Sequence, residues 1–195
     1  MLIFTKNPEK GKIKTRLAAT IGNDKAFAVY NQLLAHTVSV TADLEVDKFV
    51  FYSENIIHND IWSNKIYSKL LQSGSMLGDR MHNAFKYIFQ NGYSSAVLIG
   101  TDCPELTAEI VLKSFQEISS KDVIVGPAFD RGYYLLGMNK LIPELFENIL
   151  WSTSTVLKDT LNICDKNNLN YSLLPMLHDI DEEKDLIYLS SISKS

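Results

Sequence analysis

Five cationic side chains follow a short apolar run at the beginning of the chain. They lie between residues 6 and 16. Glu9 is the only acid among residues 1–17, so this segment carries a net charge of +4 in a chain whose net charge is −4. A basic loop after a strand offers backbone N–H, ammonium and guanidinium groups to phosphate oxygens. We therefore predict a phosphate-binding loop in which Lys6, Lys14 and Arg16 contact the ligand and Gly11 lets the backbone approach closely.

This loop matches neither of two familiar phosphate-binding motifs. Gly-x-x-x-x-Gly-Lys-Ser/Thr and Gly-x-Gly-x-x-Gly are both absent from it. The predicted ligand is a nucleotide or another phosphoester, and a solvated basic turn is the alternative. Lys10 and Lys12 are assigned to solvent on either interpretation.

An acid stands at the end of a second apolar run, Ala96–Ile99, which is typical of a buried strand. A carboxylate at this position is costly unless it is solvated, paired or bound to a metal. Mg²⁺ and Mn²⁺ commonly use one or two carboxylates together with substrate phosphates. We therefore predict that Asp102 binds Mg²⁺ or Mn²⁺, with capping of the following turn as the alternative. Cys103 is interpreted as a small buried thiol rather than a nucleophile, because no His lies near it in the sequence.

Two further acids follow later strand candidates. Asp130 lies between two such runs, where a carboxylate can serve as a general base toward an acceptor hydroxyl; a hairpin turn is the alternative. Asp181 is predicted to complete a two-carboxylate metal site with Asp102, although an acid in the first turn of a helix needs no function. His178 is expected to make a structural hydrogen bond.

Composition restricts the class of protein. A length of 195 residues with 46% hydrophobic residues suits one domain over residues 1–195. The rest of the chain is acidic, which argues against nucleic-acid binding. There is neither an apolar run long enough to span a membrane nor a secretory signal pattern, so a cytoplasmic protein is expected. Two widely spaced cysteines favour reduced thiols. Oligomeric state is left open.

Strand and helix patterns alternate along the chain. This alternation, with continuously apolar strands, predicts an α/β layered fold with a mostly parallel sheet, in which ligands bind at the carboxyl ends of the strands. The predicted strands are Leu2–Thr5, 49–52, Ala96–Ile99, 123–125, 133–136 and 171–174. The predicted helices are 24–42, Leu77–Gln90, 108–119 with Thr107 as N-cap, and 153–166 with Ser152 as N-cap.

Together these motifs resemble a family of bacterial glycosyltransferase-A-like proteins, described as nucleotide-diphospho-sugar transferases or radical-SAM/selenium-associated transferases. The resemblance spans nearly the whole chain. It rests on residues 4–8 (FTKNP), Gly11, 14–17 (KTRL), 72–74 (QSG), 77–81 (LGDRM), 99–104 (IGTDCP), 126–127 (GP), Asp130, 132–135 (GYYL), 151–153 (WST) and 179–181 (DID).

The resemblance implies a Rossmann-like three-layer sandwich of the nucleotide-diphospho-sugar transferase type. It implies that Asp102 is the metal-binding acid and that Thr15 belongs to the phosphate loop. It also implies that Gln72, Gly74 and Arg80 lie near the base or ribose. Trp151 is either an anchor next to an N-cap or a surface for stacking.

Arg131 and the segment Thr101–Cys103 depart from the family pattern. Arg131 stands where the family usually has glycine in Asp-Gly-Gly-Tyr-Tyr, and Thr101-Asp102-Cys103 lacks a complete Asp-x-Asp motif. The first departure can alter contacts with the acceptor, and the second leaves the metal with one firm carboxylate.

The predicted function is metal-dependent transfer from a nucleoside diphosphate-sugar to a small acceptor. Cations of the loop, Arg16 among them, neutralise the leaving phosphate, and Asp130 acts as the base. One alternative is a nucleotidyltransferase that joins an NTP to a small phosphorylated or sugar acceptor. A non-catalytic nucleotide-binding protein is the other.

Overall fold

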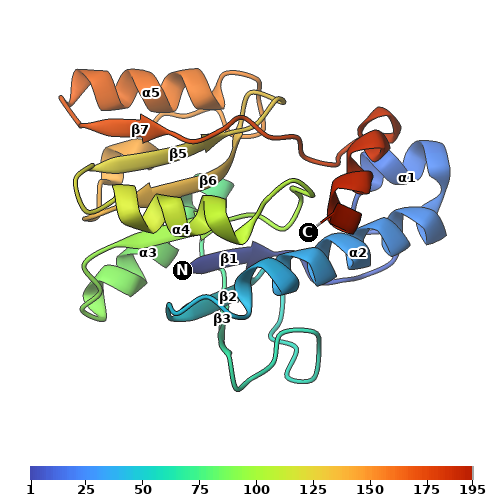
Figure 1. The fold of residues 1–195 in the computed structure, drawn as a ribbon. Helices are drawn as coiled ribbons and strands as arrows, with labels where there is room; N and C mark the ends of the chain where they lie inside the picture. Colours follow the sequence, from blue (N-terminus) through green and yellow to red (C-terminus); the bar gives the residue numbers. More distant parts are fainter. Residues whose placement is uncertain (195) are drawn as a thin grey trace.

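Seven strands form one mixed sheet in the order β3-β2-β1-β4-β6-β5-β7 (Figure 1). The computed structural model describes residues 1–194. Only β6 runs antiparallel to its neighbours, β4 and β5; the remaining pairs are parallel. The strands are β1 Leu2–Thr5, β2 Lys48–Tyr52, β3 Tyr67–Leu71, β4 Ala96–Ile99, β5 Val123–Pro127, β6 Tyr133–Met138 and β7 Tyr171–Leu173.

Helices cover both faces of the sheet, which confirms the predicted three-layer α/β fold. The α-helices are α1 Thr15–Ile21, α2 Asn23–Thr41, α3 Leu77–Gln90, α4 Ala108–Glu117 and α5 Val156–Lys166. Two 3₁₀ segments, η1 Pro143–Phe146 and η2 Glu183–Lys194, complete the described part. None of the helices in residues 1–194 combines the length and apolar character that crossing a bilayer requires.

The core is divided by the sheet into two layers. Residues of α2 and α4 pack on one face together with Ile3, and residues of α3, η1 and α5 pack on the other together with Leu2. Both Leu2 and Ile3 are fully buried. Adjacent residues of β1 therefore enter opposite layers, as expected for a central parallel strand.

A third, smaller cluster fixes the end of the described chain. Leu17 of α1, Leu33 of α2 and Ile180 are buried together, and Leu186 and Leu189 of η2 pack against them. In Figure 1 the C-terminal segment lies beside α1. The cluster thus joins the phosphate-loop region to residues more than 160 positions away in the sequence.

Local details differ from the sequence-based expectations. The helix predicted at 153–166 begins at Val156, so its N-cap is Thr155 and not the predicted Ser152, which lies in the preceding loop with a φ of 62°. Strand β3 and helix α1 were not predicted. β3 includes the polar residues Ser68 and Lys69, and α1 has only seven residues, too few to show a helical period.

Candidate functional site

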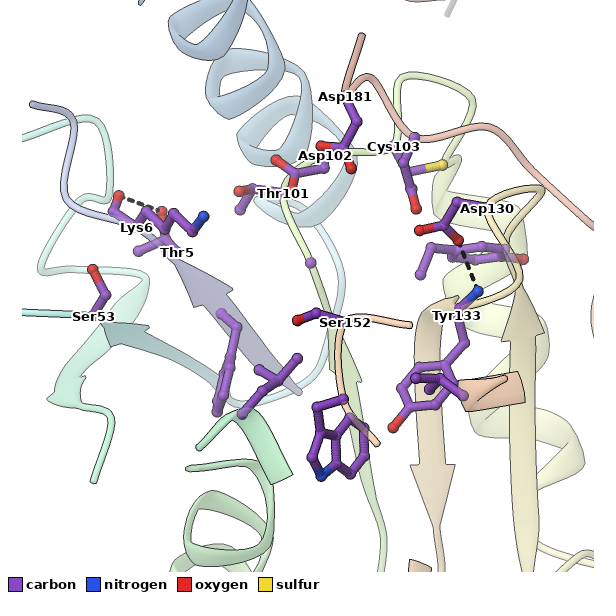
Figure 2. Close-up of a pocket in the computed structure, with 18 of the residues that line it drawn as sticks. Thr5, Lys6, Ser53, Thr101, Asp102, Cys103, Asp130, Tyr133, Ser152 and Asp181 are labelled. Carbon is purple, nitrogen blue, oxygen red and sulfur yellow. Dashed lines mark hydrogen bonds between the residues drawn. The ribbon is translucent and has the colours of Figure 1, made fainter. Parts of the chain in front are cut away.

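A cleft of about 830 Å³ opens at the carboxyl edge of the sheet. Because β1, β4, β5 and β7 share one direction, the residues that follow them meet at this edge. Figure 2 shows Lys6 and Ser53 on one wall, Asp130 and Tyr133 on the opposite wall, and Asp102 with Asp181 between them. The topology thus brings together side chains from five separate parts of the sequence.

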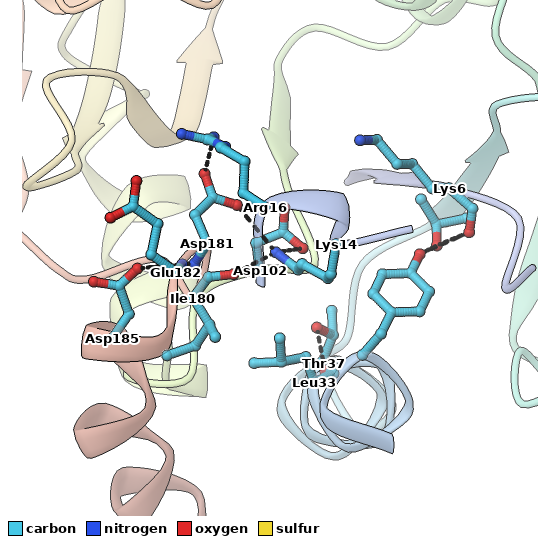
Figure 3. Close-up of polar contacts among 12 residues, drawn as sticks. Lys6, Lys14, Arg16, Leu33, Thr37, Asp102, Ile180, Asp181, Glu182 and Asp185 are labelled. Atoms are coloured by element: carbon cyan, nitrogen blue, oxygen red, sulfur yellow. Dashed lines mark hydrogen bonds and ion pairs between the residues drawn. The ribbon is translucent and has the colours of Figure 1, made fainter. Parts of the chain in front are cut away.

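Lys14 forms the polar centre of the cleft. Its side chain is only 5% exposed, and its ammonium lies 2.9 Å from Asp102 Oδ1 and 3.4 Å from Asp181 Oδ1 (Figure 3). It also donates a hydrogen bond of 2.6 Å to the carbonyl of Ile180. Burial disfavours the charged ammonium, but the two carboxylates outweigh this and raise the pKa of Lys14. Lys14 therefore carries its charge throughout the neutral range.

The backbone at Lys14 is strained. Lys14 is the N-cap of α1 in the left-handed region, with φ 47° and ψ 44°. This conformation costs an L-residue other than glycine about 1–2 kcal/mol. Strain of this kind persists where surrounding contacts determine the geometry. Here the ammonium contacts hold the side chain inward.

Both oxygens of Asp181 are engaged. Arg16 Nη2 donates to Oδ2 at 2.5 Å, and Lys14 lies nearest Oδ1. The backbone N–H groups of Asp181 and Glu182 are instead capped by Asp185 Oδ2, at 3.0 and 2.7 Å (Figure 3). The Asp181 side chain therefore faces the cations of the opening loop rather than capping its own segment.

Lys6 is exposed on the opposite wall (Figure 2). Within residues 1–194, no carboxylate lies within ion-pair distance of its ammonium. The backbone is held by a 2.7 Å hydrogen bond from the Tyr30 hydroxyl to the Lys6 carbonyl, and Asn7 Oδ1 accepts the N–H of Glu54 at 2.9 Å. A rigid loop thus presents a cation that is free to meet an anion.

Asp130 has features of both predicted roles, the hairpin turn and a carboxylate that faces the ligand. Its Oδ1 accepts the N–H of Gly132 at 2.8 Å, which is the predicted turn interaction. The residue also lines the cleft and is exposed. One carboxylate oxygen therefore fixes the turn, and the other remains available.

Of the other residues predicted to bind the nucleotide, some line the cleft and some lie outside it. Thr15, Gln72 and Arg80 line the cleft. The Gln72 amide donates to the carbonyls of Thr5 and Phe51, which leaves its oxygen for a ligand.

Neither predicted glycine lines the main cleft. Gly74 lines a smaller neighbouring pocket. Gly11 has a φ of 85°, so the turn explains glycine at that position without close approach to a ligand.

Trp151 lines the cleft from the loop before α5 and packs on α3. A Cβ added at Gly78 would overlap the Trp151 indole. The contact explains glycine in the first turn of this helix and fixes the position of the ring.

Asp179 was not predicted as a site residue, yet it lines the cleft. Burial, followed by the carboxylates of Asp102 and Asp130, raises the pKa of Asp179 well above its usual range. The signal was present in the sequence: one apolar residue separates Asp179 from Asp181, and along extended backbone this alternation places both acids on the side opposite Ile180, which is fully buried.

Two neighbouring residues have structural roles. His178 Nδ1 lies 2.9 Å from Glu105 Oε2, which is the kind of bond the sequence suggested. Cys103 is buried, and its burial raises the pKa of the thiol well above its ordinary value. A thiol of this kind is a poor nucleophile.

The residues present fit a divalent metal through Asp102. No group of three His, Cys, Asp or Glu side chains within residues 1–194 is arranged to hold a metal ion. The Asp102 side chain is 44% exposed, and only its Oδ1 contacts Lys14. Asp181, by contrast, is occupied by two cations. Asp102 can therefore offer one oxygen to a metal whose remaining ligands are water and phosphate.

Comparisons with known proteins identify relatives of this chain. Residues 34–153 match the model of DUF2064, described as an uncharacterized protein conserved in bacteria. No curated protein matches the sequence. A crystal structure from Desulfovibrio desulfuricans G20, whose name gives nucleotide-diphospho-sugar transferase as its inferred activity, is 33% identical. The similarity covers 95% of this chain and 83% of that one, with a TM-score of 0.86.

More distant structures share the fold. The 4-diphosphocytidyl-2C-methyl-D-erythritol synthase of Anaerococcus prevotii is 10% identical, with a TM-score of 0.59 and coverage of 100% of this chain and 96% of that one. A manganese complex of Rv0371c from Mycobacterium tuberculosis is 9% identical, with a TM-score of 0.52 and coverage of 96% of both chains.

Proposed function

The chain belongs to the DUF2064 family, whose description specifies no reaction. From the residues that line the cleft, we propose that the protein transfers a sugar from a nucleoside diphosphate-sugar to a small hydroxyl-bearing acceptor. The reaction uses Mg²⁺ or Mn²⁺. The observation that carries the proposal is the convergence of Lys6, Lys14 and Arg16, all from the opening loop, on one cleft that also holds Asp102.

Relatives support this choice of ligand. The D. desulfuricans protein is named for nucleotide-diphospho-sugar transfer and aligns over nearly the whole chain. The cleft also lies where open α/β sheets bind ligands, outside the carboxyl ends of the strands.

The chemistry follows from the positions of the charges. The acceptor hydroxyl attacks the anomeric carbon, the bond from that carbon to the diphosphate oxygen breaks, and the hydroxyl proton passes to Asp130. Negative charge then accumulates on the departing nucleoside diphosphate. Lys6 and Arg16 neutralise this charge, and each such preorganised contact is worth about 3–4 kcal/mol of barrier.

Lys14 acts through the residues that it contacts. Its ammonium holds Asp102 and Asp181 in place, so its role is to position the acids as well as to add positive charge. A metal bound at Asp102 would supply further neutralisation of the diphosphate.

A second candidate is nucleotidyl transfer to a small acceptor. It is favoured by the shared fold with the A. prevotii synthase. The same cations would then stabilise pyrophosphate as the leaving group. Release of pyrophosphate from an NTP supports this candidate, and release of a nucleoside diphosphate from a sugar donor supports the first.

The experiment is a thermal-shift panel of UDP, GDP and their sugar conjugates, with and without Mn²⁺. A ligand at 100 times its Kd stabilises a protein by about 2.7 kcal/mol. Lys6→Gln is expected to weaken nucleotide binding, whereas Lys10→Gln, which removes a cation outside the cleft lining, leaves it unchanged. Asp102→Asn is expected to remove the metal-dependent part of the shift.

Three results would count against the proposal. If no nucleotide shifts the native protein, the ligand class is wrong. If Lys6→Gln and Lys10→Gln behave alike, the cleft is not the nucleotide site. If Asp102→Asn retains the metal-dependent shift, Asp102 does not bind the metal.

A further inference from the structure

Charge is distributed unequally across the cleft. The wall formed by the ends of β1 and β3 and by α3 contributes Lys6 and Arg80, and no acid from these segments lines the cleft. The wall formed by the segments after β4, β5 and β7 contributes four acids: Asp102, Asp130, Asp179 and Asp181. No Lys or Arg from residues 98–181 lines it.

Only part of this acidic wall is neutralised. Lys14 pairs with Asp102 and Asp181, and Arg16 pairs with Asp181. Asp130 is exposed, and no Lys or Arg nitrogen lies within 4.0 Å of its carboxylate among the residues that the structure describes. The neighbouring Arg131 is exposed and is not part of the cleft lining. This side of the cleft therefore repels anions.

The lining on and beside this wall suits a hydroxyl-rich molecule. Tyr133 on the wall supplies an aromatic surface, and Ser152 and Thr153, from the loop before α5, supply hydroxyl groups. Figure 2 shows Asp130 and Tyr133 on the wall opposite Lys6, with Ser152 between the walls. Hydroxyl and carboxylate acceptors bind the O–H groups of polyols, and aromatic faces pack on apolar or cationic surfaces.

The cleft has room for a second molecule beside the nucleotide. Its volume of about 830 Å³ lies near the upper end of the range of about 300–1,000 Å³ for small-molecule sites. A nucleoside diphosphate held at the cationic wall leaves the Asp130 side for the acceptor.

From this asymmetry we infer that the acceptor is a polyhydroxyl compound without a phosphate or carboxylate group, either neutral or carrying an amine, and that Asp130 excludes phosphorylated acceptors. The inference rests on the proposed function where it calls the bound molecule an acceptor. The preference for molecules without negative charge depends only on the side chains of the acidic wall. Unpaired carboxylates reject an anionic competitor by repulsion, which is a common source of specificity.

The experiment compares glucosamine with glucosamine 6-phosphate, and glycerol with glycerol 3-phosphate. Kd values are measured by calorimetry with and without saturating UDP. We expect the unphosphorylated member of each pair to bind at least tenfold more tightly. In Asp130→Asn, the preference is expected to fall below about threefold, while Asp43→Asn, which changes an exposed acid outside the cleft lining, keeps the native preference.

Several outcomes would overturn the inference. These are equal or tighter binding of the phosphorylated member, failure of both members of each pair to bind up to 100 mM, and a native preference that persists in Asp130→Asn. A protein that binds no nucleotide would contradict the proposed function. Because each pair is also measured without UDP, the preference for the unphosphorylated member can still be tested in that case.

Discussion

Arg131 illustrates how one backbone angle constrains a residue of the cleft. It has a φ of 73°, and its backbone closes the turn through an N–H bond to the Ala128 carbonyl while its own carbonyl accepts the N–H of Leu157. The turn carries Asp130. Glycine would adopt this positive φ without strain. Arg131 therefore leaves the turn intact at a cost in conformational energy.

Arg131→Gly is expected to stabilise the protein by up to about 1 kcal/mol, because the relief of left-handed strain exceeds the entropy that glycine adds to the unfolded chain. The corresponding rise in Tm is about 2–4 °C. Differential scanning calorimetry measures it. Lys86→Gly in α3 is the matched control and should destabilise by about 1 kcal/mol. An unchanged or lower Tm for Arg131→Gly would show that the turn is not strained.

At the scale of elements, ring stacking joins the Asp130 turn to the C-terminal segment. The His178 ring stacks between Phe129, at a centroid distance of 3.9 Å, and Tyr188 of η2, at 3.6 Å. His178 is also anchored to Glu105, which follows β4. Three of the loops that build the cleft are thereby held together.

Tyr188→Ala removes one side of this stack. We expect the loss of the stacking contact to lower the free energy of unfolding by about 0.5–1.5 kcal/mol, in addition to the loss caused by the apolar area that is no longer buried. Urea denaturation provides the measurement. Tyr87→Ala serves as control, since Tyr87 is also a partly exposed tyrosine but no ring contact joins it to another described residue. Equal losses in the two variants would contradict a specific contribution from the stack.

Helix α3 sets the position of Trp151 through Gly78. In Gly78→Ala the new methyl group displaces the indole, while the helix retains a good helix former. We expect UDP or its sugar conjugates to bind at least threefold more weakly with little change in Tm. Tryptophan fluorescence titration reports both ring position and affinity. Ala84→Gly, in the same helix but outside the cleft, should instead lower Tm. Unchanged affinity in Gly78→Ala would exclude Trp151 from the ligand contacts.

At the scale of the whole molecule, the layer that contains α5 makes stability sensitive to alkaline pH. Cys164 is fully buried against this layer, and burial raises the pKa of its thiol to about 11 from 9.0. Since the folded pKa lies above the unfolded one, the contribution of this thiol to stability is complete below pH 9. It is lost as pH rises through 11.

One pKa unit corresponds to about 1.4 kcal/mol, so Cys164 accounts for about 2–3 kcal/mol of alkaline destabilisation between pH 9 and 11. Cys164→Ala lacks this contribution. The difference in unfolding free energy between the native protein and Cys164→Ala should therefore narrow across that range, as measured by urea titration under reducing conditions. A constant difference would show that the thiol does not ionise on unfolding.

The sequence by itself determined the layered α/β fold and the segments that reach the cleft. Apolar runs such as Ala96–Ile99 predict buried parallel strands, and parallel strands end at one edge regardless of loop detail. Lys6, Asp102 and Asp130 could thus be selected as neighbours before any contact was known. The motif resemblance was confirmed by the relative that is 33% identical.

Only the tertiary structure decided how the charges are paired. Lys14 and Asp181 are separated by 167 positions, and their contact depends on packing of the C-terminal segment against α1. The same C-terminal segment brings Asp179 into the cleft. Local patterns carry no information on such partners, because ion pairing is decided by long-range packing and burial rather than by the spacing of residues along the chain.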